Sequence, residues 1–374
     1  MTTVCLAMIV KDEEEVVGRC IESVRELIDY WVICDTGSTD STRARALEAL
    51  GSIPGEWHET AWVDFGHNRS ELMALARGRA DYLLLLDADE TVTWSPDVKE
   101  KLHADAYRIL HHGTLEHWTN LKVVRGDIPW RYVGAAHEYL AADSPFNREF
   151  LPDLTINVHV EKPRGAKLRR NLELLLAQVE KTPDVPRFHF YLAETYRDLF
   201  HLTEPRDREY AERAIEHYRC RIALSGGVEA FLSHCSIGIL LDEAMEDWPA
   251  AMDAFVEAWE LRPDRMEPLY ELVSRLRQRG HANTAYALLQ PALGTPLPPE
   301  GVFVKRWIYE WGIQFEHALL AYAVGDFEAS LASTESLLGR SDLPAAHRQG
   351  FEELRRELLE LTAQSSPSGT EPRR

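Results

Sequence analysis

The feature that most constrains the fold is an apolar run that ends abruptly in acidic residues. Residues 83–90 read LLLLDADE, so four leucines are followed by Asp87, Asp89 and Glu90. The leucines indicate a buried strand. Carboxylates cannot be buried without a partner, so the strand must deliver them to a place where their charge is neutralised.

The first 160 or so residues alternate short apolar runs with helical stretches. The predicted strands are Thr3–Val10, Trp31–Cys34, Tyr82–Leu86, Thr119–Val124 and Thr155–Val160, and the predicted helices are Glu13–Leu27, Ser41–Leu50 and Asn68–Arg79. This alternation predicts parallel strands with helices on both faces of the sheet. Ligands of such sheets bind beyond the carboxyl ends of the strands, where we expect Asp35 and Asp87.

From about Ala166 the pattern changes to helices alone, and a repeat becomes visible. Ala214, Ala251 and Ala285 occupy equivalent positions, separated by 37 and 34 residues, close to the roughly 34-residue period of tetratricopeptide units. A bulky residue follows each alanine by four positions, namely Tyr218, Phe255 and Leu289, and residues 325–338 form a degenerate further unit. We therefore predict a first domain at 1–165, a helical-repeat domain at 166–363 and a disordered polar tail at 364–374.

Charge and cysteine content narrow the class of protein. The formal net charge of −20 argues against nucleic acid or an anionic membrane as a partner, although a divalent cation could offset the charge of a small phosphorylated ligand. The five cysteines include no C-x-x-C pair, so neither a disulfide framework nor a zinc site is indicated. We expect a cytoplasmic protein. No run approaches the roughly 18 apolar residues of a membrane helix.

Asp87 and Asp89 are spaced so that both carboxylates can converge on one point, because alternate residues leaving a strand point the same way. Mg²⁺ and Mn²⁺ prefer such oxygens and often bridge to substrate phosphates. The alternative is a surface turn with helix-capping acids, which D-x-D alone would favour. The apolar run directly before the two acids favours the metal site.

A second polar cluster, DTGSTDST at 35–42, follows another predicted strand. Gly37 permits a tight turn, Ser38 and Thr39 offer hydroxyls, and Asp40 can cap the helix that begins near Ser41. An ordinary strand-to-helix loop would have the same composition. G-x-G-x-x-G and G-x-x-x-x-G-K-[ST] are both absent, which weakens dinucleotide binding and P-loop chemistry.

Three further positions carry candidate chemistry. Asn68 and Arg69 lie at a loop-to-helix junction, where an anion could bind. His137 and Glu138 follow small residues near a turn, and either could accept a proton. His159 ends an apolar strand and is either a hydrogen-bonded core histidine or a third metal ligand. The alternative for Arg69 is a solvated surface arginine, and the alternative for His137 and Glu138 is a chance pair without function.

Taken in order, five segments resemble family-2 glycosyltransferases of the type-A nucleotide-sugar fold. They are LAMIVKDEE, VICDTGSTDST, DFGHNRSEL, YLLLLDADE and WRYVGAAHEY. The likeness is greatest to members with C-terminal tetratricopeptide repeats, and residues 187–198 resemble the linker helix of those proteins. The resemblance implies an α/β nucleotide-sugar-binding domain followed by an all-α helical-repeat domain.

The same resemblance implies an activity. It is an inverting transfer, dependent on Mg²⁺ or Mn²⁺, from a nucleoside-diphosphate sugar, a UDP-sugar, to a peptide, protein, glycan or small-molecule acceptor. The repeat domain would bind part of the acceptor, shield the catalytic domain or form a homodimer interface.

Roles carry over from the resemblance position by position. Those implied in donor binding are Val10, Lys11, Glu13, Asp35, Ser38, Asp40, Asn68, Arg69, Asp87 and Ala88. Those implied in metal binding are Asp87, Asp89 and His159. Many members use a Glu-Asp pair to supply the catalytic base, whereas this chain has His137-Glu138. Glu138 is therefore the candidate base, with His137 beside it.

Two other functions compete with this interpretation. A tetratricopeptide scaffold with a degenerate nucleotide-sugar domain is one, but intact Asp35, Asp87 and Asp89 argue against it. A nucleotidyltransferase is the other, but such enzymes need a glycine-rich basic loop after the first strand, and VKDEEEV here is acidic. Hydrolysis of a UDP-sugar would separate enzyme from scaffold.

Overall fold

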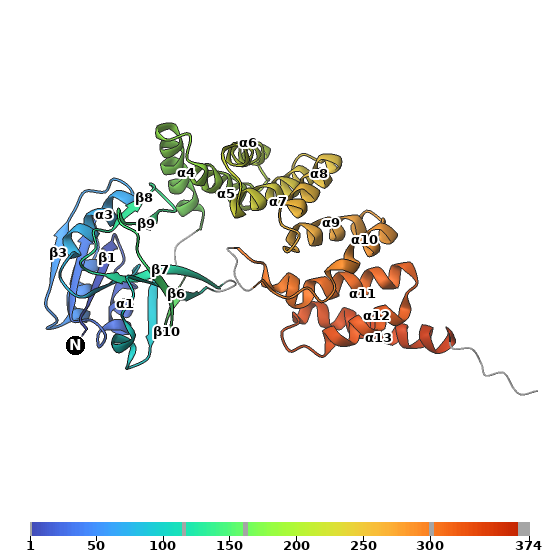
Figure 1. Ribbon diagram of the computed structural model, residues 1–374, viewed down its shortest axis with the longest axis horizontal. Helices are drawn as coiled ribbons and strands as arrows, with labels where there is room; N and C mark the ends of the chain where they lie inside the picture. Colours follow the sequence, from blue (N-terminus) through green and yellow to red (C-terminus); the bar gives the residue numbers. More distant parts are fainter. Residues whose placement is uncertain (1, 114–116, 160–163, 299–302, 366–374) are drawn as a thin grey trace, which may run out of the picture. The chain divides into compact units, whose positions relative to one another are not determined.

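The computed structural model describes residues 2–113, 117–159, 164–298 and 303–365. The chain divides into two compact units, Met1–Leu202 and Thr203–Arg374. The boundary expected at residue 165 coincides with the start of helix α4 (Arg164–Lys181), whereas the compact units divide after α5 (Pro186–Leu202). Both helices therefore belong to the first unit (Figure 1).

The first unit is built on an eight-stranded sheet with the order β3-β2-β1-β4-β7-β6-β10-β5. The strands are β1 (Val4–Val10), β2 (Tyr30–Asp35), β3 (Gly55–Glu59), β4 (Tyr82–Leu85), β5 (Glu90–Trp94), β6 (Ala106–His112), β7 (His117–Arg125) and β10 (Arg148–Val158). The helices α1 (Val17–Val24), α2 (Thr42–Leu50) and α3 (Phe65–Ala76) connect the early strands, and β8 (Arg131–Val133) and β9 (Tyr139–Ala141) form a separate ribbon.

All five predicted strands and all three predicted helices have counterparts, but the sheet is mixed rather than parallel. β3, β2, β1 and β4 are parallel, whereas β7 runs antiparallel to both β4 and β6, and β5 runs antiparallel to β10. The prediction of a parallel sheet was wrong for the half of the sheet that contains β7, β6, β10 and β5. There β6 and β7 form an antiparallel hairpin. Strands β3, β5 and β6 were not predicted, and Val160 lies outside the described residues.

Burial on both faces explains the leucine run. In the central strand β1, Leu6 and Met8 pack with α1 and α2, whereas Cys5 and Ala7 pack with α3. The leucine run divides in the same way. Leu84 and Leu86 belong to the cluster with α1 and α2, and the other two leucines belong to the cluster with α3. A strand inside a two-sided core has no polar face, so its polar residues are confined to its ends.

The strand order fixes where those ends lead. β1 is flanked by β2 on one side and by β4 on the other, so the chain progresses in opposite directions from this strand. In open α/β sheets the crevice at such a switch point, beyond the carboxyl ends of the strands, is the usual ligand site. The residues after β1, β2 and β4 meet there.

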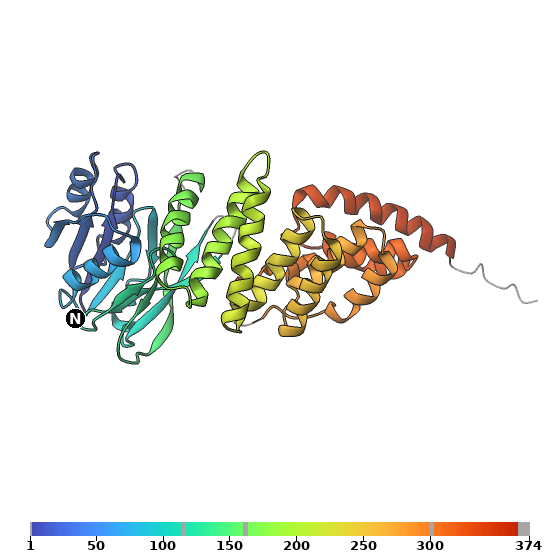
Figure 2. The same ribbon diagram turned by 90° about the horizontal axis from the view of Figure 1, so that it is seen from above.

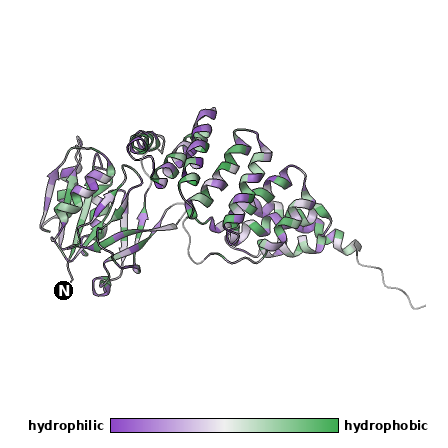
Figure 3. Ribbon diagram, turned by 45° about the horizontal axis from the view of Figure 1, so that its top comes forward, coloured by the Kyte–Doolittle hydropathy of each residue, from purple (hydrophilic) through white to green (hydrophobic). Residues whose placement is uncertain are grey.

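The second unit is all-helical. It contains α6 (Arg208–Leu224), α7 (Val228–Glu243), α8 (Trp248–Leu261), α9 (Glu267–Gln278), α10 (Ala282–Leu289), α11 (Ile313–Val324), α12 (Phe327–Leu338) and α13 (Ala345–Ser365). Successive helices lie side by side in Figure 2, and hydrophobic segments, green in Figure 3, run along them.

The repeat predicted from the sequence is confirmed in the buried positions of these helices. The three alanines and the three bulky residues four positions later, Ala214, Ala251, Ala285, Tyr218, Phe255 and Leu289, are all fully buried. The degenerate unit at 325–338 forms α12. Helix α13 reaches Ser365, so the predicted tail begins inside it, and residues 366–374 lie outside the described residues.

Candidate active site

The loop after β2 is organised by Asp35. This buried residue accepts hydrogen bonds at Oδ1 from the backbone N–H groups of Gly37 (3.0 Å) and Ser38 (2.7 Å). Gly37 has a φ of 107°, a conformation that a residue with a side chain adopts only with strain. Asp35 therefore closes a tight turn and places Ser38 at the carboxyl edge of the sheet.

The loop after β1 is tied to that turn by a ladder of hydrogen bonds. The N–H of Asp12 donates to Ser38 Oγ (3.1 Å), and the N–H of Glu13 donates to Thr42 Oγ1 (2.7 Å). Asp40 Oδ2 accepts from the N–H of Glu14 (3.1 Å).

Two of the predicted donor-binding residues in these loops also have clear places. Val10 is buried and its carbonyl accepts from the N–H of Thr36, whereas the side chain of Lys11 is exposed. The structure thus brings the two predicted nucleoside loops together into one rigid rim.

Asp87 is held by two basic side chains. Its Oδ1 accepts a short hydrogen bond from Arg69, and its Oδ2 lies 3.4 Å from Lys122 Nζ. Burial opposes ionisation of Asp87, but the charges of Arg69 and Lys122 dominate and lower its pKa. The two cations thus favour the ionised form of Asp87, whose side chain is 35% exposed.

Beneath Asp87 lies a buried ion pair that the sequence analysis missed. Lys122 Nζ donates to both carboxylate oxygens of Glu90, at 2.8 and 3.0 Å, and Glu90 Oε2 also accepts from the N–H of Asp87 (2.9 Å). The side chains of Glu90 and Lys122 are 6% and 10% exposed. The one signal available was a lysine inside the apolar strand segment NLKVV, residues 120–124.

Arg69 links the donor side of the site to the candidate base. Besides Asp87, it forms an ion pair with Glu138, whose Oε1 lies 2.8 Å from Arg69 Nε. Burial of the guanidinium lowers its pKa, but Asp87 and Glu138 outweigh that effect and raise it. Tyr132 supports the cation from β8, with its ring centroid 5.7 Å from the guanidinium.

Asn68, the neighbour of Arg69, has a different place. It is fully buried, donates to the carbonyl of Ala61 (2.8 Å) and accepts from the N–H of Val63 (2.9 Å). It therefore shapes the loop before α3, and any effect on a donor would pass through that loop.

The expected metal ligands Asp87, Asp89 and His159 do not converge, although Asp89 precedes β5 and His159 follows β10, the strand that pairs with β5. The N–H of His159 donates to the carbonyl of Asp89 (3.0 Å), while its Nε2 lies 2.9 Å from Thr91 Oγ1. Within the described part of the chain, these three residues do not form a set with ligand atoms inside 4.8 Å of one another.

Asp89 is nevertheless the carboxylate that suits a hard cation. Burial raises its pKa, and the negative charges of Asp87 and Glu90 raise it further. No basic side chain among the described residues forms an ion pair with it, in contrast to Asp87 and Glu90. A divalent cation beside Asp89 would relieve this repulsion, so the Asp89 carboxylate is suited to bind one.

His137 faces away from this cluster. Its ring stacks on Tyr191 of α5, with centroids 4.3 Å apart and planes 10° apart. Desolvation of the ring, together with the charges of Lys167 and Arg187, lowers its pKa to about 4. The structure therefore separates the two residues of the predicted pair, with Glu138 facing Arg69 and His137 facing α5.

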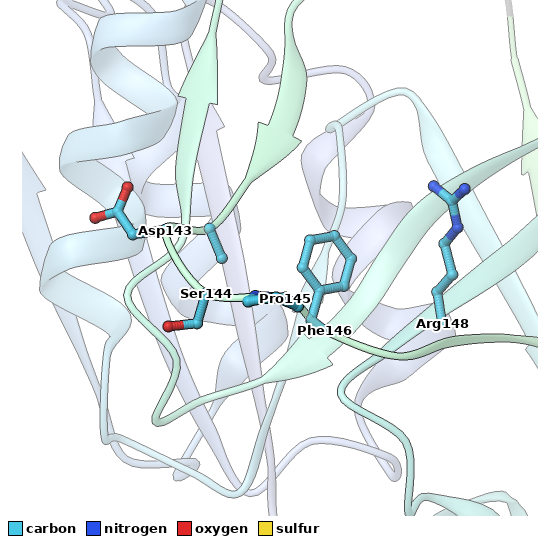
Figure 4. A pocket seen from close by; sticks show the side chains of 6 residues that line it. Asp143, Ser144, Pro145, Phe146 and Arg148 are labelled. Atoms are coloured by element: carbon cyan, nitrogen blue, oxygen red, sulfur yellow. The ribbon is translucent and has the colours of Figure 1, made fainter.

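A shallow pocket lies elsewhere in the first unit, in the connection between β9 and β10. It is lined by Ala142, Asp143, Ser144, Pro145, Phe146 and Arg148 (Figure 4). None of these residues belongs to the cluster around Asp87, so the pocket is separate from the candidate active site.

Comparison with known proteins identifies a family match for part of the first unit. Residues 5–114 match the sequence model of "Glycosyl transferase family 2". A curated relative, the "TPR repeat-containing protein Synpcc7942_0270" of Synechococcus elongatus, is 43% identical over 91 residues, which are 24% of this chain and 21% of the relative. The match thus spans about a fifth of that relative's length.

Similar solved structures are more distant. Glucosyl-3-phosphoglycerate synthase from Mycobacterium tuberculosis, in complex with Mn²⁺, UDP-glucose and phosphoglyceric acid, is 17% identical over 30% of this chain and 44% of that chain, with a TM-score of 0.24. S. aureus TarS 1–349 in complex with UDP-GlcNAc is 10% identical over 68% of this chain and 92% of that chain, with a TM-score of 0.36. Scores this low add nothing to the family match.

Within the described residues, no helix has the length and apolar character needed to cross a bilayer. The matched residues 5–114 run from β1 to the end of β6 and contain Asp35, Arg69, Asp87 and Asp89. Residues 5–114 of the first unit therefore match glycosyltransferase family 2, and tetratricopeptide-like helices follow them in the chain.

Proposed function

We propose that this protein is an inverting, metal-dependent glycosyltransferase that moves a sugar from a UDP-sugar to an acceptor. The observation that carries the proposal is the chain of charges from Glu90 through Lys122, Asp87 and Arg69 to Glu138. In this chain the guanidinium of Arg69 pairs with two carboxylates: Asp87, on the proposed donor side, and Glu138, on the proposed acceptor side.

The rim formed by the loops after β1 and β2 would bind the nucleoside, with Lys11, Glu13, Asp35, Ser38 and Asp40 in contact with it. Mg²⁺ or Mn²⁺ would be held by Asp89, the acid of this cluster that forms no ion pair among the described residues, and would supply Lewis-acid stabilisation of the departing diphosphate.

Transfer then depends on Glu138. It would accept the proton of the acceptor nucleophile as the new bond to the anomeric carbon forms and the bond to UDP breaks. Attack from the face opposite UDP inverts that carbon. General base catalysis of this kind contributes about 10²–10⁴-fold. Because Arg69 pairs with both Asp87 and Glu138, it would hold the base in a fixed position relative to the donor side of the site.

The acceptor is proposed to be a peptide, a protein or a glycan, bound partly by the tetratricopeptide-like helices. Such repeats commonly present extended concave surfaces to partners.

A panel of nucleotide sugars tested for metal-dependent hydrolysis examines the proposal directly. We expect hydrolysis of one UDP-sugar by the wild-type protein and none by Asp89→Ala. Glu138→Gln should bind the same donor with unchanged affinity and transfer its sugar about 10²-fold more slowly. Absence of both binding and hydrolysis for every donor would favour a tetratricopeptide scaffold instead.

A further inference from the structure

Helix α5 packs directly on the turn that carries the candidate base. The turn runs from Gly134 to Tyr139, between β8 and β9. Phe188 fills the space beside Gly134, where an added Cβ would come within 2.9 Å of the Phe188 ring. Arg187 donates from its guanidinium to the carbonyl of His137 (3.2 Å).

Stacked rings complete the contact. The guanidinium of Arg187 lies 5.2 Å from the ring centroid of Tyr139 and 4.6 Å from that of Tyr191. Tyr191 also carries the ring of His137 on its face. Arg187 therefore touches the turn both at its backbone and at the side chain that ends it, a planar contact that lysine would not reproduce.

The turn needs such external support because its backbone is strained. His137, which carries a side chain, has a φ of 51°, whereas the φ of 108° at Gly134 is one that glycine adopts without strain. A residue with a side chain is strained in the left-handed region and persists there where its surroundings over-determine it. Glu138 follows the strained residue directly, and its carboxylate meets Arg69 on the other side.

We infer that Arg187 is a positioning residue: it holds the His137–Glu138 turn so that the Glu138 carboxylate stays against Arg69. α5 is then part of the active site, although it lies outside the family match at residues 5–114. That Arg187 affects sugar transfer rests on the proposed function of Glu138 as the base. That Arg187 fixes the conformation of the turn does not depend on that proposal.

Hydrogen exchange of the whole protein tests the hold on the turn. In Arg187→Ala, amides of peptides covering 130–141 should exchange faster than in the wild type. Arg79→Ala is the matched control, since Arg79 also lies over a ring of the first unit, Tyr30 at 6.0 Å, and Tyr30 belongs to β2 rather than to the Gly134–Tyr139 turn. Faster exchange in Arg187→Ala alone supports the inference, and unchanged exchange at 130–141 overturns it.

If amides of the whole protein exchange faster in Arg187→Ala, the experiment is repeated with Arg187→Lys. Lysine keeps the charge and the aliphatic stem but loses the planar stacking. The same comparison of exchange at 130–141 with Arg79→Ala then decides between the two outcomes.

A double-mutant cycle tests whether Arg187 acts through Glu138. Arg187→Ala should reduce sugar transfer on the order of 10–100-fold, with donor binding unchanged, because a small misplacement of a catalytic group has effects of this size. In the Glu138→Gln background the same substitution should have almost no effect, since the group it positions is gone. Equal factors in both backgrounds would overturn action through Glu138. Full transfer by Glu138→Gln alone would instead refute the base assignment, and hydrogen exchange would still decide the hold on the turn.

Discussion

Lys122 is the residue whose burial most affects the stability of the site. It neutralises Glu90 at 2.8 Å and contributes to the neutralisation of Asp87 at 3.4 Å. Removal of one partner from a buried ion pair leaves an uncompensated charge and costs about 3–5 kcal/mol. We therefore expect Lys122→Met to lower the free energy of unfolding by that amount, measured by urea denaturation.

The control for this substitution is Lys99→Met. Lys99 pairs with Asp29 at 2.7 Å on the surface of the same unit, with side chains 26% and 43% exposed. Surface pairs contribute roughly 0–1 kcal/mol. Equal costs for the two substitutions would show that the Lys122 ion pair is solvated rather than buried.

His137 should make stability depend on pH. Its folded-state pKa of about 4 lies below the ordinary value of 6.5, so between these values the unfolded chain binds a proton that the folded chain does not. The His137 contribution is therefore fully present above about pH 6.5 and is lost progressively as the pH falls towards 4.

His137→Asn removes the titrating group, and asparagine tolerates positive φ better than most residues. We expect urea midpoints to fall less for this variant than for the wild type when the pH is lowered from about 7.5 to about 5. Parallel falls in the two proteins would exclude His137 as a source of the pH dependence.

At this scale the sequence predicted the acids better than their partners. Asp35 and Asp87 follow strands, so their place at the carboxyl edge could be read from the pattern. The roles of Lys122 and Glu90 depend on β7 lying beside β4, a pairing between segments about 40 residues apart that no local pattern specifies.

Among the elements, helix α3 and the Gly134–Tyr139 turn approach each other unusually closely. A Cβ added at Gly66 of α3 would lie 2.2 Å from the carbonyl oxygen of Gly134, and the N–H of Phe65 donates to the carbonyl of Ala135 (3.1 Å). Main-chain atoms cannot move aside as a flexible side chain can. Gly66 therefore sets the distance between Arg69 and Glu138.

Gly66→Ala should separate the helix from the turn. We expect a loss of about 1–3 kcal/mol in the free energy of unfolding, typical of overpacking, and a matching reduction in sugar transfer. Gly18→Ala is the control, because Gly18 lies in α1 with no atom within 4 Å of an added Cβ. That substitution should stabilise the helix by roughly 0.5–1 kcal/mol. Similar effects of both substitutions on transfer would contradict the role of Gly66.

Element prediction from the sequence succeeded where a strand is buried throughout and failed where a strand mixes polar and apolar residues. β1 and β4 are apolar throughout and were identified. β5, whose sequence is ETVTW, begins directly after the D-x-D. The acids before it and at its first position made this segment look like a loop rather than a strand. The direction of β7 depends on its hairpin with β6, which a parallel α/β pattern does not anticipate.

On the scale of the whole molecule, the division after Leu202 separates the chain differently from the change in sequence pattern near residue 166. Helices α4 and α5 resemble the following helices in composition, so the sequence alone groups them together. Their contacts with the Gly134–Tyr139 turn and with Phe65 place them in the first unit.

Two fragments test this division. A fragment of residues 1–202 should unfold cooperatively and keep the donor affinity of the full chain. A fragment of residues 1–165 lacks α5, which exposes the turn, and should be less stable and transfer poorly. Urea denaturation and UDP binding compare them. Equal stability of the two fragments would place α4 and α5 outside the catalytic unit.

Titration calorimetry with UDP, in the presence and absence of Mn²⁺, tests most directly whether Asp89 holds a cation shared with a diphosphate. Wild-type protein should bind UDP with Mn²⁺ and lose most of that affinity when the metal is chelated. Asp89→Asn should show the weak, metal-independent affinity in both conditions while remaining folded. Equal, metal-dependent binding by the wild type and Asp89→Asn would contradict the metal assignment, and absence of UDP binding under every condition would contradict the proposed donor.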